Sequence, residues 1–281
     1  MKYLSSTFLA LLAFNGFVWY WVVAGGYSDD LNLYFLDVGQ GDSELIDLPS
    51  GRQILIDGGP DSAKTLEALD RAVPPTDRYL DAVIATHPQL DHFGGLVGVL
   101  EKYNVGVFIY NGRVSNLPEW QALWSIIKEK KIPVVALKSG DDIRSGDSLI
   151  KVVSPSSADL DSKEPNDTAL VMELEDKKAS ALFTSDIGSN IEAEILGRLD
   201  LPIGILKVAH HGSKYSSSQA FIQAIAPRLS VIEVGKNSYG HPTREALANL
   251  LRAGSEIHRT DKEGTIHLEI KNDLVGVFTG R

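Results

Sequence analysis

Short apolar runs alternate with stretches of helical spacing along most of the chain. Residues 80–85 form a run typical of a buried strand, and residues 95–103 place apolar side chains at helical spacing. We predict strands at residues 31–38, 43–48, 53–56, 80–85, 105–110, 134–137, 148–153, 169–174, 181–184, 203–209, 229–234, 256–259 and 265–270. We predict helices at residues 63–73, 95–103, 118–130, 191–199, 219–226 and 243–253, and a turn at residues 140–146. This alternation indicates a layered α/β fold.

The order of these elements predicts two strand-rich sheets that pack face to face, with helices on the outside. Acidic residues and glycines follow several strands, so we expect the loops after the strands to form one active edge. Since one core is enough for a chain of 281 residues, we predict a single domain at residues 31–281.

The first 30 residues have a different pattern. Residues 3–27 carry no charge and are long enough to span a bilayer, so we predict a hydrophobic helix that anchors the protein in the membrane, with a linker at residues 25–30. Lys2 on one side and Asp29 and Asp30 on the other place the domain outside the cytoplasm. The alternative is a cleaved signal peptide, because Val23, Ala24 and Gly25 include small residues, and the domain would then be secreted.

Composition limits the chemistry. The formal net charge of -10 argues against a protein that coats nucleic acid through bulk positive potential, but a metal could still recruit a phosphodiester locally. Cysteine is absent, so a metal site would use His, Asp, Asn or water.

One motif follows the apolar run at residues 80–85. His87, Asp91 and His92 lie within six residues, and each is a common metal ligand. Asp186 and His210 also follow predicted strands. Five ligand-type residues at one edge are hard to explain by packing, so we predict a metal site formed by His87, Asp91, His92, Asp186 and His210. His211 competes with His210 for the ligand role, and we favour His210 because it is the first residue beyond its strand.

Five motifs stand at the ends of predicted strands: Asp37-Val38-Gly39-Gln40-Gly41-Asp42, Ile56-Asp57-Gly58-Gly59, His87 to His92, Ser185-Asp186 and Lys207-Val208-Ala209-His210-His211-Gly212-Ser213. Together they resemble the metallo-β-lactamase superfamily, and within it the C-terminal hydrolase domain of the ComEC-type DNA-internalisation (competence) proteins. The resemblance covers about residues 31–270 and implies an αββα sandwich with a metal cleft at its edge.

The chain departs from the superfamily pattern at the first of two metal positions. Gln89 stands where the motif has a His, and no His lies between His92 and His210 to complete that position. The resemblance therefore implies one complete site, at Asp91, His92, Asp186 and His210, and one depleted site around His87. A second metal would need help from Gln89, Asn166 or Asp167. Oxygen-rich ligation would suit Zn²⁺ or Mn²⁺.

The remaining candidates are assigned by position. We expect Asp91 and Asp186 to orient a metal-bound hydroxide, and His211 or His241 to protonate the leaving group or bind the oxyanion. Candidate phosphate contacts are Lys207, Ser213, Lys214, Lys236 and Tyr239, with solvated surface as the alternative for the lysines. Residues expected to brace the cleft by hydrogen bonds are Asp37, Gln40, Asp42 and Asp57.

These features favour a membrane-anchored metal-dependent phosphodiesterase, with DNA or another phosphodiester as its partner. The acidic net charge suits an alternative enzyme that hydrolyses a small ester, a lactone or an envelope phosphodiester. The depleted metal position suits a catalytically silent binding module.

Overall fold

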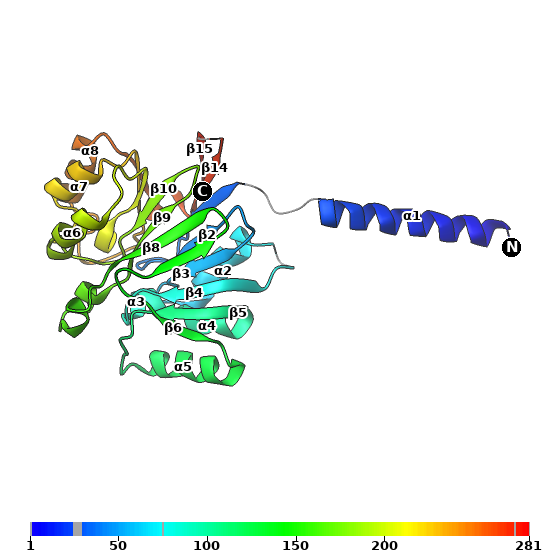
Figure 1. Ribbon diagram of the computed structural model, residues 1–281, viewed down its shortest axis with the longest axis horizontal. Helices are drawn as coiled ribbons and strands as arrows, with labels where there is room; N and C mark the ends of the chain where they lie inside the picture. Colours follow the sequence, from blue (N-terminus) through cyan, green and yellow to red (C-terminus); the bar gives the residue numbers. More distant parts are fainter. Residues whose placement is uncertain (1, 25–29, 75, 273, 281) are drawn as a thin grey trace.

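Two mixed β-sheets form the centre of the computed structural model, which describes residues 2–24, 30–74, 76–272 and 274–280 (Figure 1). The first sheet has the spatial order β15 (Leu274–Thr279), β14 (Ile266–Lys271), β1 (Leu31–Phe35), β2 (Glu44–Asp47), β3 (Gln53–Ile56), β4 (Tyr79–Ala85), β5 (Asn104–Tyr110) and β6 (Val134–Ala136). The second has the order β13 (Glu256–Arg259), β12 (Leu229–Ile232), β11 (Ile205–Lys207), β10 (Ser180–Phe183), β9 (Val171–Glu175), β8 (Ser148–Ser154) and β7 (Asp142–Ser145).

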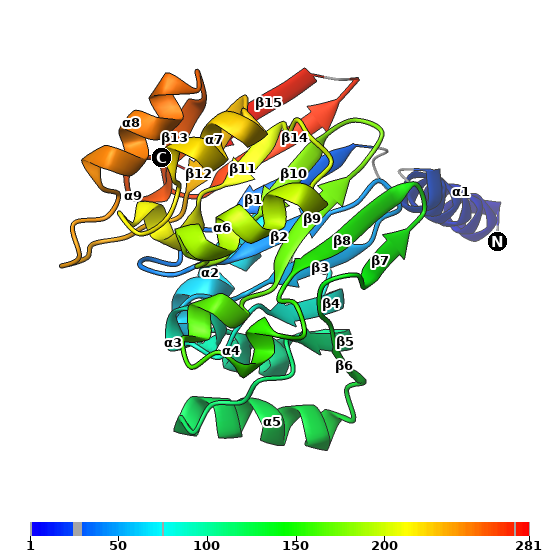
Figure 2. The same ribbon diagram turned by 60° about the vertical axis from the view of Figure 1, so that its left-hand side comes forward.

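Helices cover the outer face of each sheet (Figure 2). On the first sheet these are α2 (Ser62–Ala72), α4 (Leu96–Lys102) and α5 (Pro118–Lys130), with the one-turn α3 (Leu90–Phe93) at its edge. On the second sheet they are α6 (Ser189–Ile195), α7 (Gln219–Ile225) and α8 (Arg244–Arg252), with the short α9 (Thr260–Glu263) after β13. The predicted two-sheet sandwich with helices outside is confirmed.

The alternation of side chains along each strand separates the core into layers. In β3, Ile54 and Ile56 pack between the sheets, whereas Leu55 faces the helices. In the second sheet, Ile205 faces the first sheet and Leu206 packs against the outer helices. Strands of both sheets therefore have apolar residues on both faces, which explains their nearly continuous apolar sequences.

Parallel pairing brings the functional loops to one edge. Strands β3, β4 and β5 run parallel, and so do β10, β11 and β12. In sheets of this kind, ligands bind beyond the carboxyl ends of the parallel strands. The loops after β3, β4, β10 and β11 carry the predicted ligand motifs, so the fold explains why they meet.

Two strand predictions were wrong. We predicted a turn at residues 140–146, but Asp142–Ser145 forms β7, paired antiparallel with β8. We ended the last strand at residue 270 and missed β15, which pairs with β14. Both are edge strands with exposed residues, so their extended conformation comes from pairing with a neighbour rather than from an alternating pattern of their own.

The N-terminal segment forms the helix α1 (Lys2–Ala24), which lies apart from the sheets (Figure 1). The predicted membrane span is not supported, since among the described residues no helix combines the length and the hydropathy needed to cross a bilayer. Polar residues such as Thr7 and Asn15 lower the mean hydropathy of this segment. Except for Asp30, the predicted linker at residues 25–30 lies outside the described residues.

Candidate metal centre

Four ligand-type side chains converge at the edge of the sandwich. One atom from each of Asp91, His92, Asp186 and His211 lies within 4.8 Å of the others. The Asp186 carboxylate is central: its Oδ2 lies 3.4 Å from His92 Nε2 and 3.6 Å from His211 Nε2. His211 Nε2 also lies 3.8 Å from Asp91 Oδ2. Two acids and two imidazoles at these separations form a group that could hold one divalent cation.

Hydrogen bonds orient both imidazoles toward this group. His92 Nδ1 donates to Asp57 Oδ2 at 2.7 Å, and His211 Nδ1 donates to the Glu233 carbonyl oxygen at 2.8 Å. Because each Nδ1 carries a proton, each ring in its neutral form would present the lone pair of Nε2 to the group. Ligating histidines in proteins are held in this way.

The buried polar atoms fit a bound cation. His92 Nε2, His211 Nε2 and Asp186 Oδ1 are buried and have no hydrogen-bond partner. Buried polar atoms without partners are rare and need an explanation. A divalent metal at the centre of the group would satisfy all three, so the residues present fit the cofactor implied by the motifs.

The electrostatic field of the group also favours positive charge. Burial alone would lower the pKa of His211, but Asp186 and then Asp42 raise it to about 10. Burial would raise the pKa of Asp186, yet His211 and His92 hold it well below the usual range. The carboxylates thus stabilise extra positive charge at the site, as they would that of a metal ion.

His87 lies beside this group, but both of its ring nitrogens have hydrogen-bond partners in the protein. Its ring is fully buried, with Nε2 3.1 Å from Gln89 Oε1 and Nδ1 3.3 Å from Ser185 Oγ. Burial, followed by the charge of His92, lowers the pKa of His87 to about 4, so the ring is neutral. Both ring nitrogens have polar partners within the protein, as expected where Gln89 replaces a second histidine.

The backbone is strained where the strands deliver these residues. Asp57, Ser185, His210 and His211 have positive φ angles of 54°, 47°, 51° and 55°. Residues other than glycine rarely adopt this conformation, and it is concentrated at functional sites. The left-handed turn at His210 and His211 directs His211 inward, where its side chain is 2% exposed, and leaves that of His210 29% exposed.

This geometry differs from our prediction that His210, rather than His211, is the metal ligand. His210 Nε2 lies 3.7 Å from Asp186 Oδ2 but does not belong to the four-residue group. His211, which we considered as a proton donor, is the one that joins Asp91, His92 and Asp186. The choice depends on two backbone torsions that the sequence does not reveal.

A second buried network lies beneath the metal group. Lys207 is fully buried and contacts the Asp42 carboxylate and the Ser185 carbonyl oxygen, so it does not reach the surface as a phosphate contact. Asp42 Oδ1 in turn lies 3.2 Å from His211 Nδ1. Lys207 thereby links two of the loops that hold the metal group.

Two acids complete this buried network. The Glu233 carboxylate accepts a hydrogen bond from the Ser43 N–H at 3.0 Å. Burial and then the neighbouring Asp42 raise the pKa of Glu44 to about 8. Sequence reasoning missed Glu44 and Glu233, although a charged residue in an apolar strand, as in Val231-Ile232-Glu233-Val234, could have indicated a buried polar role.

The other predicted residues fall into three groups. Asp57 and Asp42 lie against the metal-group histidines, and Gln40 accepts a hydrogen bond from the Gly235 N–H at 3.2 Å. Asp37 instead lines a separate cavity near Thr265. Lys214, Lys236 and Tyr239 are exposed and His241 is half-buried, whereas Ser213 is buried.

His241 and its turn lie near the two histidines that follow β11. Its ring centroid is 5.7 Å from that of His210 and 6.5 Å from that of His211. Asn237 fixes the turn by donating to the His241 carbonyl at 3.0 Å and accepting from its N–H at 3.1 Å. Tyr239 stands beside it, 5.7 Å from ring to ring.

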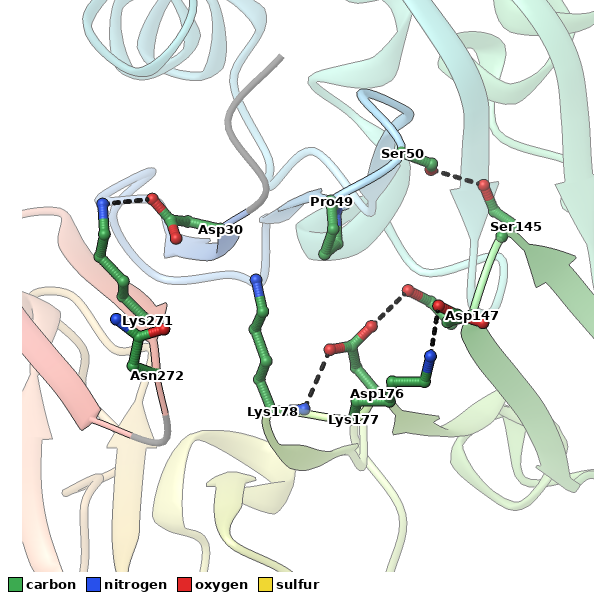
Figure 3. A pocket seen from close by; sticks show the side chains of 12 residues that line it. Asp30, Pro49, Ser50, Ser145, Asp147, Asp176, Lys177, Lys178, Lys271 and Asn272 are labelled. Carbon is green, nitrogen blue, oxygen red and sulfur yellow. Dashed lines mark hydrogen bonds and ion pairs between the residues drawn. The ribbon is translucent and has the colours of Figure 1, made fainter.

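A larger cavity, of about 750 Å³, lies at the opposite end of the strands (Figure 3). It is bounded by the start of β1 and by the turns after β2, β7, β9 and β14, and contains none of the predicted site residues. Its charged side chains pair with each other: Lys271 with Asp30 at 3.0 Å and Lys177 with Asp147 at 2.7 Å. The metal group is therefore the better candidate for chemistry.

Known proteins with similar sequences identify the family. The metallo-beta-lactamase superfamily matches residues 36–235. The chain belongs to this superfamily. ComE operon protein 3 of Bacillus subtilis (strain 168) is 32% identical over 263 residues, which cover 87% of this chain and 33% of that protein. Competence protein ComA of Neisseria gonorrhoeae is 29% identical, covering 82% of this chain and 31% of that protein.

These matches confirm the resemblance to the ComEC-type competence proteins. The chain spans about a third of the length of these relatives. A solved structure, Igni18, a metallo hydrolase from Ignicoccus hospitalis, shares the fold with a TM-score of 0.58 and 14% identity, covering 85% of this chain and 100% of that one. The protein is thus a metal-dependent hydrolase of the metallo-β-lactamase superfamily, related to competence proteins.

Proposed function

We propose that this protein is a metal-dependent phosphodiesterase that acts on DNA. The observation that carries the proposal is the convergence of Asp91, His92, Asp186 and His211, with both Nε2 atoms unpartnered and directed into the group. A divalent cation, Zn²⁺ or Mn²⁺, would supply Lewis acidity and a water nucleophile at neutral pH. The similarity to competence and recombination proteins supports a nucleic acid as the substrate.

The chain's own residues would perform the remaining tasks. Asp57 and the Glu233 carbonyl hold His92 and His211 in their ligating tautomers. Asp91 is the most exposed member of the group, so it faces an incoming substrate. We expect His241, Lys214 and Lys236 to donate hydrogen bonds to phosphoryl oxygens.

The ligand assignment gives the first test. We expect His211→Gln to lower metal affinity and hydrolysis of DNA and of bis(4-nitrophenyl) phosphate by at least about 100-fold, because it removes one of four ligands. His210→Gln should retain the metal. His258→Gln is the matched control, since His258 pairs with Glu256 and Glu263 away from the site. Metal content by mass spectrometry and initial rates with added Zn²⁺ or Mn²⁺ provide the measurements.

Other outcomes would contradict the proposal. If single-stranded and duplex DNA both stay intact with either metal while a lactone or a small ester is hydrolysed, the enzyme acts on small molecules, as the net charge of -10 would suit. Less than about one metal per chain and no hydrolysis of any substrate would indicate a binding module.

A further inference from the structure

A small cleft lies on the loop that follows His211. Its volume is about 420 Å³, and it lies between this loop and the helices α6 and α8. The lining residues that matter here are Ser189, Lys214, Tyr215, Gln219, Glu245 and Arg252. Tyr215 is only four residues beyond His211, so their Cα atoms are at most about 15 Å apart. A few nucleotides of an extended strand would therefore be enough to span the distance from the cleft to the metal centre.

The ring of Tyr215 is an exposed aromatic surface on an anchored backbone. Its side chain is 67% exposed, and among the described residues of the domain only Tyr239 is a more exposed aromatic. The backbone beneath it is held in place: the Tyr215 carbonyl accepts from the Ser189 N–H at 2.9 Å, and its N–H donates to Ser213 Oγ at 3.3 Å. Lys214 Nζ lies 4.9 Å from the ring centroid. An exposed ring on an anchored backbone can accept a stacked planar group.

The charges of the cleft favour an anion. Lys214 and Arg252 contribute two cations against one acid, Glu245. Arg252 donates to Asn249 Oδ1 at 2.8 Å, and neither cation forms an ion pair with an acid among the described residues. This local excess of positive charge contrasts with the net charge of -10 for the whole chain. A ring to stack on, next to two available cations, matches a base and its phosphate.

We propose that the Tyr215 cleft binds one unpaired nucleotide of a single strand whose backbone crosses the metal centre, and that the enzyme therefore prefers single-stranded to duplex nucleic acid. The base stacks on Tyr215 while Lys214 and Arg252 contact its phosphate. A paired base in a duplex does not expose its face, so it cannot use this surface. The inference rests on the proposed function, because it assumes a nucleic-acid substrate.

The stacking is tested by binding, separately from hydrolysis. The full chain is kept in a chelator so that no strand is cut, and fluorescence anisotropy is measured at one salt concentration. The probes are a short oligothymidylate and a chain of equal length and charge that lacks bases. We expect wild type to bind the oligothymidylate roughly 5- to 100-fold more tightly than the abasic chain. Equal affinity for the two probes would overturn the proposal.

Substitutions test whether the preference for the oligothymidylate over the abasic chain comes from the cleft. Tyr215→Leu should remove most of this preference for bases, whereas Tyr215→Phe, which keeps the ring, should retain it. Tyr79→Leu is a matched control, since Tyr79 is an exposed tyrosine at the start of β4, the end remote from the metal centre. Loss of affinity for both probes by the same factor in Tyr215→Leu would instead indicate a structural role and contradict stacking.

A small substrate separates this inference from the proposed function. Bis(4-nitrophenyl) phosphate contains no nucleotide, so its hydrolysis by wild type with added metal tests the metal group alone. If wild type fails to hydrolyse this compound, the proposed function fails whatever the binding shows. If hydrolysis is normal but Tyr215→Leu leaves the preference for bases unchanged, only the nucleotide cleft is wrong.

Discussion

Single residues decide the chemistry of this site through their backbone conformation. His210 and His211 are identical side chains that follow each other in the chain. Both have positive φ angles, and the left-handed turn that results directs only His211 into the metal group. Asp57 is another example: the same carboxylate accepts from His92 Nδ1 and from the Thr86 N–H and hydroxyl. Residue type gives the candidates, but torsion angles and partners select among them.

A buried carboxylate outside the site provides a residue-scale prediction. Glu173 in β9 is fully buried, and burial is the first cause that raises its pKa from the ordinary value of 4.5 to about 7. Below about pH 4.5 this carboxyl group is protonated in both the folded and the unfolded protein, so its ionisation costs no stability. The stability of the folded protein then falls as the pH rises through 7, because the buried group resists ionisation. We expect Glu173→Gln to leave the free energy of unfolding unchanged near pH 4 and to raise it at pH 8 by at most about 3 kcal/mol.

Urea denaturation from pH 4 to pH 8 measures this effect. Glu67→Gln is the control, because Glu67 is an exposed residue of α2. A Glu173→Gln variant that is less stable than wild type at pH 8 would show that the ionised carboxylate is favourable there. Its hydrogen bonds from the Asp200 N–H, at 3.1 and 3.3 Å, would then outweigh the cost of burial.

At the scale of elements, strand β11 connects the two halves of the site. Lys207 at its carboxyl end contacts Asp42 in the loop between β1 and β2, and the Ser185 carbonyl after β10. Gly41 allows this loop to approach closely: its φ is +157°, and a Cβ atom there would lie 2.3 Å from the Asp91 carbonyl oxygen. The three loops are therefore held together by a buried ion pair and by close backbone contact.

This arrangement predicts an asymmetric response to substitution. Lys207→Met leaves the buried Asp42 carboxylate without its cation, so we expect the free energy of unfolding to fall by about 3–5 kcal/mol. The double variant Lys207→Met with Asp42→Asn has no unpaired charge and should recover at least about half of that loss. Urea denaturation of the metal-free variants gives both values.

A measurement of metal affinity distinguishes an effect on the position of His211 from an effect on the stability of the fold. Asp42 lies against His211 Nδ1, so the double variant should bind Zn²⁺ about 10- to 100-fold more weakly than wild type even where its fold is stable. If the double variant is as unstable as Lys207→Met alone, the charge pairing is not the cause. Unchanged metal affinity would show that Asp42 does not position His211.

At the scale of the whole molecule, α1 is separate from the three apolar cores. None of residues 7–20, the part of α1 whose side chains are described, belongs to the layer between the sheets or to the two layers beneath the helices. Its large apolar side chains, such as Phe8 and Phe14, are exposed. The domain therefore has a complete core without this helix.

Removal of α1 tests the predicted domain boundary. A chain that begins at Asp30 keeps the ion pair between Asp30 and Lys271. We expect its free energy of unfolding to match that of the full chain within about 1 kcal/mol, with the same rate on bis(4-nitrophenyl) phosphate. A loss of more than about 2 kcal/mol in denaturant titrations would show that residues 1–29 belong to the folded domain.

The sequence by itself determined the layered fold and most of the metal-ligand candidates. Apolar runs with ligand-type residues at their ends were enough to predict two sheets and a common edge, because local hydrophobicity fixes strands and parallel strands share a carboxyl end. Asp91, His92 and Asp186 were found in this way. Edge strands β7 and β15 were missed because their pairing partners, not their own patterns, make them extended.

Only the tertiary structure decided which histidine joins the group and what the buried charges do. The selection of His211 depends on two positive φ angles, and the burial of Lys207 depends on Asp42, which lies 165 residues away in the chain. The placing of Tyr215 beside a cleft likewise requires α6 and α8, which are separate in sequence. Contacts between distant segments set these features, and no local pattern records them.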